Sequence, residues 1–452
     1  MNIVIIGCGK IGLSILSNLV AEGHDVMVID SNPDVIQETN NIYDVMGVCG
    51  NGVDCEPLEE VGVSKADLFI ATTDSDELNM LSCFIAKRMG AKHTMARIRN
   101  PEYNDESHTF MRKQLDISVA INPELLAAHE LFNILKLPSV AKIETFSGGN
   151  FEMIELRLRP DSLLDGIRIA DMRNKFKSKV LICAVQRGEE AYIPDGDFVL
   201  KSGDKIGLSA KHGEITRFIK ELGADQKKAR NIMLFGGGRI AYYLARKLTS
   251  AGIAVTIIER DRKVCDALSE ALPKAVIVHG DGAEQELLLE EGLLSVDAFV
   301  SLTGMDEENI LIAAFAQSKN VPKVIAKVNR DELIPLAEHL GIDCTISPKK
   351  TVANSVVQYA RALENSVGSS METLYKLMDD KVEALEFKVK ADFPMLNVPF
   401  KELKLKKNIL VAGIMRDRES IIPAGEDVLL AGDRVIILAA NQRINTLSDI
   451  LK

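Results

Sequence analysis

A glycine-rich turn near the start of the chain has the residue types and spacing of a phosphate cradle. The segment IVIIGCGKIG places Gly7, Gly9 and Gly12 directly after a short apolar strand and at the start of an amphipathic helix. In such a turn the first glycine permits the tight bend, the second lets the backbone approach a pyrophosphate, and the third lets the helix pack closely on the strand. The amides at the helix N-terminus then point at the phosphate oxygens. The chemistry predicted here is the binding of a diphosphate-bearing nucleotide.

Asp30 is the residue that we expect to bind the ribose of this nucleotide. It ends DVMVID, the apolar segment that follows the helix after Gly12, which is the context that the dinucleotide fingerprint requires. Its carboxylate would accept hydrogen bonds from ribose hydroxyls and would repel a 2′-phosphate, which favours NAD(H) or an adenine nucleotide over NADP. The alternative is a doubly wound domain that has lost its ligand and keeps its glycines for geometry alone.

The same pattern occurs a second time in the other half of the chain. GGGRIA begins at Gly236, with Ala241 in place of the third glycine, and the spacing from Ala241 to Glu259 equals that from Gly12 to Asp30. The fingerprint permits this alanine. Charged residues follow Glu259, beginning with Arg260. They make it less certain whether this pocket would reject a nucleotide with a 2′-phosphate. The alternative is again a domain that has lost its ligand and keeps these glycines for geometry alone.

Two pairs of polar residues in the turns offer further ligand contacts. Lys10 and Arg239 occupy the same position in the two loops, where a cation could reach phosphate oxygens or could remain a solvated side chain. Asn51 and Asp281 lie in the GNG and GDG turns. They could border the adenine, or they could belong to plain turns.

Another group of candidates follows the later strands. Thr73 and Asp74 come after the apolar segment LFIA, at the edge of the crevice where ligands of open α/β sheets lie; Asp74 could instead cap the next helix. Arg97 in MARIRN and Lys327 in IAKVNR close a later strand of each half. Both cations could neutralise phosphate or form ordinary surface pairs, and we favour the ligand role for Arg97.

The chain consists of two halves with similar sequences. The segment that begins at Ala71 matches the one that begins at Ser301, with nearly the same offset as the two glycine loops. Beyond the nucleotide-binding segments, residues 191–210 resemble residues 420–440, and their Gly-Asp turns share the offset of the glycine loops. Each half therefore contains two modules, and the polar segment 223–231 is expected to link the halves.

The order of the elements predicts the fold of each module. Apolar strands alternate with amphipathic helices in the larger modules, which is typical of a doubly wound parallel sheet. The smaller modules contain strands joined by Gly and Asp turns, with one terminal helix at about 212–222 in the first. Long helices are expected at 123–136 and 349–364. The predicted class is α/β, with two tandem Rossmann-like domains, each followed by a small α+β domain; the expected boundaries are 1–122, 140–224, 230–348 and 370–452.

Composition excludes several other classes of protein. The 452-residue chain is long enough for several domains. It contains no apolar run long enough to cross a bilayer and no basic, apolar leader, so we expect a cytosolic protein. Seven cysteines without a CxxC pair argue against disulfides and zinc and favour buried free thiols. A formal net charge of −11 without a long basic run argues against nucleic acid as the main ligand.

The residues needed for catalysis are not evident. The seven histidines do not cluster, and no Walker loop, nucleophile elbow or HExxH motif occurs. A single Tyr-x-x-x-Lys, Tyr243 with Lys247, lies in the helix after the second loop, where we interpret it as coincidence. Sensing is the favoured interpretation. An NAD-linked oxidoreductase of unusual architecture and a soluble nucleotide-binding scaffold remain the alternatives.

The duplicated order of IVIIGCGKIG, Asp30, GNGVD, TTDSDELNM, ARIRNPEY and a small module with a Gly-Asp turn resembles the TrkA family. This resemblance covers essentially the whole chain. Members are cytosolic regulatory subunits of Trk-type potassium uptake, with tandem RCK nucleotide domains, each followed by an RCK_C domain. It implies a non-enzymatic protein that attaches peripherally to the cytosolic face of the cell membrane. There it would gate a potassium-translocating, TrkH-like subunit.

The resemblance also implies the ligands and the assembly. Family ligands include NAD(H) and ATP or ADP. RCK units usually pair through crossover helices on a neighbouring subunit, so a homo-oligomer is implied, as a dimer or a ring of four RCK pairs. The two long helices would suit that role or could equally be internal. The first pocket would contain Gly7, Cys8, Gly9, Lys10, Ile11, Asp30, Thr73, Asp74 and Arg97, and the second Gly236, Gly237, Gly238, Arg239, Ile240 and Glu259.

Overall fold

A computed structural model describes most of the chain. The described residues are 1–100, 110, 113–136, 142–146, 151–158, 162–211, 213–223, 229–342, 344–366, 371–417 and 419–452. Most of the expected linker at 223–231 and the expected domain boundaries at 140, 224 and 370 lie outside them. The chain forms two compact units, one made of Met1–Ala127 with Ser347–Glu364 and the other of Ala128–Ile346 with Asn365–Lys452.

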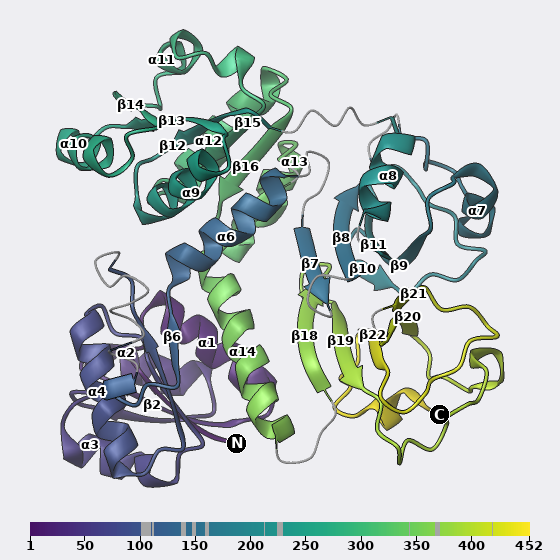
Figure 1. The fold of residues 1–452 in the computed structure, drawn as a ribbon. Coiled ribbons are helices and arrows are strands. Elements are labelled where there is room, and N and C mark those ends of the chain that lie inside the picture. The colour runs from purple at the N-terminus through teal and green to yellow at the C-terminus, as the bar shows by residue number, and fades with distance from the viewer. Residues whose placement is uncertain are drawn as a thin grey trace. The chain divides into compact units, whose positions relative to one another are not determined.

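The first unit contains a six-stranded parallel sheet, which Figure 1 draws in purple to blue. Its strand order is β3-β2-β1-β4-β5-β6. Its strands are β1 (Asn2–Ile6), β2 (Asp25–Asp30), β3 (Met46–Cys49), β4 (Leu68–Ala71), β5 (His93–Arg97) and β6 (Val119–Ile121). Strand β1 pairs with β2 on one side and with β4 on the other. The order of the strands therefore reverses between β1 and β4, which is where open α/β sheets bind ligands.

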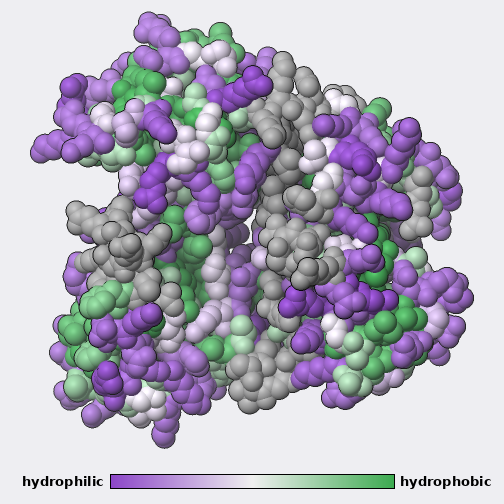
Figure 2. Space-filling view, viewed as in Figure 1, coloured by the Kyte–Doolittle hydropathy of each residue, from purple (hydrophilic) through white to green (hydrophobic). Residues whose placement is uncertain are grey.

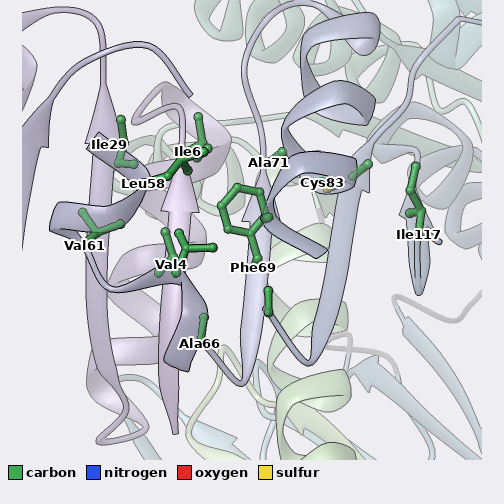
Figure 3. Packing of buried hydrophobic residues seen from close by; sticks show 14 of the residues in the cluster. Val4, Ile6, Ile29, Leu58, Val61, Ala66, Phe69, Ala71, Cys83 and Ile117 are labelled. Carbon is green, nitrogen blue, oxygen red and sulfur yellow. The ribbon is translucent and has the colours of Figure 1, made fainter. Parts of the chain in front are cut away.

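Helices connect these strands and cover the sheet. They are α1 (Lys10–Ala21), α2 (Pro33–Ile42), α3 (Cys55–Glu60) and α4 (Asp76–Met89). Figure 3 shows Val4 and Ile6 of β1 packed with Phe69 of β4 and Leu58 of α3 in a fully apolar cluster. Burial of both faces explains why the central strands are continuously apolar rather than alternating.

Helix α14 (Pro348–Ser366) packs on this first domain, although it follows the second nucleotide domain in sequence. Arg361 of α14 forms an ion pair with Glu22, and the ring of Tyr359 meets His93 edge-on, with 6.5 Å between the ring centroids. The buried side of the helix is apolar and consists of Val352, Ala353, Val356, Val357 and Ala360. This helix therefore fills a core position within its own chain.

The second unit repeats the parallel sheet in the order β14-β13-β12-β15-β16-β17. Its strands are β12 (Asn231–Phe235), β13 (Ala254–Glu259), β14 (Val276–His279), β15 (Ala298–Ser301), β16 (Lys323–Lys327) and β17 (Cys344–Ile346). The helices are α9 (Arg239–Ser250), α10 (Arg262–Ala271), α11 (Gln285–Glu290), α12 (Asp306–Ser318) and α13 (Ile334–His339). The predicted pair of doubly wound domains is confirmed.

The helix that leaves the first domain, α6 (Pro123–Leu135), belongs to this second unit from Ala128 onward. The ammonium group of Lys247, on α9, lies 5.1 Å from the centre of the Phe132 ring of α6. A cation at this distance is attracted by the ring face. The position of Lys247 against α6 thus gives it a packing role.

Two small domains complete the second unit, each built on a five-stranded antiparallel sheet. The first has the order β10-β9-β11-β8-β7, with β7 (Lys142–Phe146), β8 (Phe151–Arg157), β9 (Val180–Arg187), β10 (Glu190–Tyr192) and β11 (Lys205–Lys211), and helices α7 (Met172–Lys175) and α8 (Glu214–Glu221). The second has the order β18-β19-β22-β20-β21, with β18 (Met371–Leu377), β19 (Val382–Lys388), β20 (Ile409–Arg416), β21 (Glu419–Ile421) and β22 (Arg434–Ala440). The predicted α+β character of the small modules is confirmed.

The two small domains share one hydrophobic core. Its buried cluster combines Phe151 and Cys183 of the first with Leu377 and Ile436 of the second. A Cβ atom added at Gly413 of β20 would lie 2.7 Å from the Phe151 ring, so the glycine allows this close approach. The sequence predicts one small module for each half but does not predict their fusion.

The surface in the view of Figure 2 is mainly hydrophilic, with small hydrophobic patches among charged and polar residues. Among the described residues, no helix combines the length and apolar character needed to span a bilayer.

Candidate nucleotide-binding sites

The first glycine loop has the geometry that its sequence predicts. Gly7 has a φ of +87°, and a Cβ there would lie 2.8 Å from the Thr73 nitrogen. A Cβ at Gly12 would lie 1.9 Å from the Gly7 carbonyl oxygen, so only glycine permits this packing of α1 on the turn. No atom lies within 4 Å of the Cβ position at Gly9. The space beside Gly9 is therefore open for a ligand.

The amino end of α1 borders this space. Gly9 is the N-cap of the helix and supplies no side-chain hydrogen bond to it. Helix N-termini carry unsatisfied amide donors and a partial positive charge, which together favour phosphate. Lys10 and Ile11 begin the helix, Lys10 with an exposed side chain. Cys8 is buried, and burial, followed by the charge of Asp30, raises the pKa of its thiol to about 12.

Asp30 ties the end of β2 to the glycine loop. The Cys8 amide donates to Asp30 Oδ2 at 2.7 Å, and the Asn32 amide donates to Oδ1 at 2.9 Å. These bonds orient the carboxylate, and each oxygen keeps a second lone pair for another donor such as a ribose hydroxyl. Asn51 is exposed, and its side-chain oxygen accepts from the Val53 amide at 3.3 Å, as in an ordinary turn.

A buried amide organises the ends of β4 and β5. Asn79 Oδ1 accepts from the Thr73 amide at 2.8 Å and from the Thr73 hydroxyl at 2.7 Å. Its Nδ2 donates to the Thr73 carbonyl at 3.1 Å and to the Arg97 carbonyl at 2.9 Å. The sequence motifs alone assign no role to Asn79. The repeat offered a signal, because Asn309 stands at the equivalent position.

Arg97 is a buried cation at the same edge. Its side chain is 6 % exposed, and Nη2 donates to the Thr73 carbonyl at 2.5 Å and to the exposed carboxylate of Asp74 at 3.2 Å. Nε is buried and has no hydrogen-bond partner among the described residues. Burial, followed by the charge of Arg99, lowers the pKa of Arg97. A buried guanidinium with a spare donor is suited to an anionic partner.

The second loop reproduces the first. Gly236 has a φ of +98°, and a Cβ there would lie 3.1 Å from the Thr303 nitrogen. The Gly237 amide donates to Glu259 Oε2 at 2.6 Å, and the Asp261 amide donates to Oε1 at 2.8 Å. Gly238 has no atom within 4 Å of its Cβ position, like Gly9. Glu259 therefore plays the part that Asp30 plays in the first domain.

A cavity of about 240 Å³ lies against this second loop. It is lined by Phe235, Gly236, Gly237, Gly238, Ile258, Glu259, Arg260, Asp281, Gly282, Leu302, Thr303, Gly304, Met305 and Glu308. Five predicted site residues thus meet in one space. Arg239, Ile240 and Lys327 do not line it: Arg239 is exposed, Ile240 is buried, and Lys327 ends β16.

The buried amide network also recurs in the second domain. Asn309 Oδ1 accepts from the Thr303 amide at 2.8 Å, and Nδ2 donates to the Lys327 carbonyl at 3.0 Å.

No group of three or more His, Cys, Asp or Glu side chains in the described parts of the chain is placed to hold a metal ion. The arrangement is suited to holding phosphate and ribose through backbone amides and carboxylates.

Comparisons with known proteins agree with this architecture. The TrkA-N domain matches residues 3–123 and 232–348, and the TrkA-C domain matches residues 153–223 and 384–452. The Trk system potassium uptake protein TrkA homolog 2 of Methanosarcina mazei is 31% identical, with 100% of both chains covered. The TrkA homolog of Archaeoglobus fulgidus is 32% identical, again over 100% of both chains.

Solved structures share the fold at low identity. The RCK domain of GsuK superposes with a TM-score of 0.65 at 18% identity, covering 97% of this chain and 92% of that one. The GsuK channel bound to NAD gives a TM-score of 0.62 at 17% identity, covering 97% of this chain and 77% of that one. With two TrkA-N domains, two TrkA-C domains and full-length relatives above 30% identity, the chain belongs to the TrkA family of Trk system potassium uptake proteins.

Proposed function

We propose that this protein is a regulatory, nucleotide-sensing subunit that attaches to the cytosolic face of a Trk-type potassium uptake membrane protein. The observation that carries the proposal is the pair of glycine loops. In each, an open helix N-terminus adjoins a carboxylate that two backbone amides hold in place. This is the geometry that binds the pyrophosphate and ribose of a nucleotide. The ligands we propose are NAD(H), ATP and ADP.

The comparisons support both parts of the proposal. Full-length relatives are named as Trk system potassium uptake proteins, which supports a role in potassium transport with a TrkH-like partner. GsuK, which shares the fold, has been solved as a channel bound to NAD and also bound to ADP. A nucleotide that fits one conformation of the protein better than another would shift the gate by that difference in binding free energy.

The oxidoreductase alternative has little support in the second domain. Tyr243 is buried on α9, and the ammonium group of Lys247 faces the Phe132 ring of α6. A proton relay needs groups within hydrogen-bond reach of the substrate. Both side chains are instead engaged in packing around α9. Turnover of NADH with a small carbonyl compound would revive the alternative.

We further propose that copies of the chain associate through a repeated apolar surface. Leu81 of α4 and Leu311 of α12 are equivalent in the repeat, and their exposed fractions are 49 % and 65 %. Phe110 and Leu340, also equivalent, are exposed as well. The recurrence of exposed apolar residues at matching positions is what supports this proposal. Association through both repeats would give a dimer or a ring of four RCK pairs.

One pair of substitutions tests the pockets. Gly9→Asp and Gly238→Asp each place a carboxylate where the phosphate would lie, and the space around both Cβ positions is open. We expect each variant to remove one binding site for NADH and ATP in calorimetric titrations. The control is Gly196→Asp in the first small domain, where the added Cβ meets only Ala170 at 3.5 Å.

The same variants test the regulatory role. Co-purification with a TrkH-like subunit should survive the substitutions, whereas the response of potassium flux to added nucleotide should be lost. If both loop variants bind nucleotide like the control, the proposed pockets are wrong. If binding is lost but flux still responds to nucleotide, the sensing role is wrong.

The association surface has its own test. Leu81→Asp combined with Leu311→Asp should reduce the molar mass measured by light scattering. The control is Leu163→Asp, because Leu163 is also exposed but has Asp392 as its counterpart in the repeat. An unchanged molar mass in the double variant would contradict this surface.

A further inference from the structure

The two nucleotide pockets differ at the edge that lies beyond the glycine loop. After β4 the first domain has Asp74 and Leu78, and after β15 the second domain has Gly304 and Glu308 at the equivalent positions. Thr73 and Asn79 of this edge are kept as Thr303 and Asn309 in the second repeat, whereas Ser75 and Arg97 are replaced by Met305 and Lys327. Each edge therefore has one carboxylate, but in a different place: on the fully exposed Asp74 in the first repeat and on Glu308, which lines the cavity, in the second.

The topology shows which part of a ligand would meet this edge. The cavity extends from Glu259 and Asp281 on the β13 and β14 side, past Gly238, to Gly304 and Glu308 on the β15 side. A nucleotide with its ribose at the carboxylate that ends β13 places its pyrophosphate at the N-terminus of α9. Whatever follows the pyrophosphate then lies beside Glu308. In ATP that group is the terminal phosphate, and in NAD⁺ it is the ribose and the cationic nicotinamide ring.

Glu308 is the acidic residue of the first turn of α12 that faces this space without a partner among the described residues. Its neighbour Glu307 forms an ion pair with Arg330, and Asp306 accepts hydrogen bonds from the amides of Asn329 and Arg330. Glu308 is half-buried, lines the cavity, and makes no hydrogen bond or ion pair with the described residues. Its charge is thus available to act on a ligand, and in a partly enclosed cavity salt screens it less than at an open surface.

The first pocket presents the opposite electrostatic character at this edge. Leu78 carries no charge, and the buried guanidinium of Arg97 keeps Nε without a hydrogen-bond partner among the described residues. Asp74, which pairs with Arg97, is fully exposed and so only weakly offsets that charge. An anionic group beyond the pyrophosphate would therefore be attracted by Arg97 in the first pocket and repelled by Glu308 in the second.

We propose that Glu308 makes the second pocket selective against nucleoside triphosphates and in favour of dinucleotides such as NAD⁺, while the first pocket accepts ATP. This inference rests on the proposed function, because it requires both pockets to bind nucleotides. It assigns the two repeats different ligands within one chain. The protein would then respond to phosphorylation potential through one domain and to the nicotinamide pool through the other.

The experiment reads the two pockets one at a time in the full-length protein. In a Gly9→Asp background, calorimetry measures the affinities of the second pocket for ATP and NAD⁺. We expect Glu308→Gln and Glu308→Leu to strengthen ATP binding about three- to tenfold, the size expected for removing one charge a few ångströms from a phosphate at high effective dielectric. NAD⁺ binding should stay the same or weaken. The control is Glu290→Gln, which removes the same charge from an exposed position of α11 outside the cavity.

The reciprocal substitution completes the design. In a Gly238→Asp background, Leu78→Glu should weaken ATP binding to the first pocket by a similar factor. An unchanged ratio of ATP to NAD⁺ affinity in both Glu308 variants would overturn this inference. The proposed function would still stand if Gly238→Asp abolishes nucleotide binding to the second pocket. If Gly238→Asp leaves that binding intact, both proposals fail.

Discussion

The guanidinium of Arg361 forms a buried ion pair with the carboxylate of Glu22, although the two residues lie in distant parts of the chain. Nε and Nη2 lie 2.7 Å and 2.5 Å from Glu22 Oε2, and the two side chains are 4 % and 6 % exposed. The pair fixes α14 to the end of α1 in the first nucleotide domain. A helix encoded after the second nucleotide domain is thereby part of the first.

Removal of one partner should destabilise the first unit strongly. Arg361→Met leaves the Glu22 carboxylate buried without its cation, and the expected cost is about 3–5 kcal/mol. Chemical denaturation followed by hydrogen exchange in α1 would measure it. The double variant Arg361→Met with Glu22→Leu should recover most of this loss, because no charge then remains buried. A double variant as unstable as the single one would contradict this account.

The buried amide of Asn79 should matter for both stability and ligand affinity. Asn79→Ala removes the bonds to the backbone of Thr73 and Arg97 and leaves buried polar groups unsatisfied, at an expected cost of about 2–3 kcal/mol. The loop after β4 would also lose its support, so nucleotide affinity in the first pocket should fall. Thermal unfolding and calorimetry measure the two effects. Asn309→Ala should affect the second pocket instead, and each variant serves as the control for the other.

Gly12 and Ala241 allow a reciprocal test of the helix–strand contact. Gly12→Ala places a Cβ atom 1.9 Å from the Gly7 carbonyl oxygen, so α1 must move away from the turn. We expect a loss of about 2 kcal/mol or more in the free energy of unfolding, together with weaker binding in the first pocket. Ala241→Gly should cost no more than about 1 kcal/mol, the upper end of the usual cost of glycine relative to alanine within a helix, because Ala241 lies in the first turn of α9. Equal effects would show that the close contact is unimportant.

The glycine loops could be predicted from the sequence because their geometry is local. The positive φ of Gly7 and the contact of Gly12 with the Gly7 carbonyl depend on a strand, a turn and a helix that follow one another in the chain, whereas the close approach of Thr73 to Gly7 comes from the packing of β4. The alternation of strands and helices likewise predicts a parallel sheet without knowledge of long-range contacts. These features of the fold are confirmed.

Long-range partners could not be predicted in the same way. The apolar stripe of α14 predicts that one side of the helix is buried, but the same stripe would fit against either parallel sheet. The ion pair between Arg361 and Glu22 joins residues that no sequence motif connects. Asn79 is missed because a neutral amide in the first turn of a helix that begins with Asp76 and Glu77 resembles part of a solvated helix end. The shared core of Phe151 and Gly413 arises from two apolar sheets that each look self-sufficient in sequence.

Acidification should weaken the contact between β5 and α14. Burial, followed by the charge of Lys87, lowers the pKa of His93 below its ordinary value, although Asp67 partly opposes this. The unfolded chain therefore binds the proton first, and stability falls as the pH drops from about 6.5 through the folded-state pKa. His93→Phe keeps a ring against Tyr359 but cannot titrate. The loss of melting temperature between pH 7.5 and pH 5.5 should be smaller in the variant than in the unmodified protein, and an equal loss would refute this role.

Lys205 joins three parts of the second unit. Its ammonium nitrogen lies 3.0 Å from both carboxylate oxygens of Asp379, in the turn between β18 and β19, and 3.5 Å from Glu338 Oε1 of α13. Burial alone would lower its pKa, but Asp379, Glu155 and Glu338 together raise it. This stabilisation is therefore fully present below pH 10.5 and is lost as the pH rises through the folded-state pKa.

Neutralising this lysine should loosen the small domains from one another and from the second nucleotide domain. We expect Lys205→Met to lower the free energy of unfolding by about 2 kcal/mol, because Glu155 stays buried beside uncompensated carboxylates. The matched control is Arg434→Met, since Arg434 is the counterpart of Lys205 in the repeat but is exposed. The readout is hydrogen exchange in β11, β18 and α13, which should accelerate together in Lys205→Met and much less in the control. Faster exchange in β11 alone would mean that the lysine supports its own strand rather than the junction.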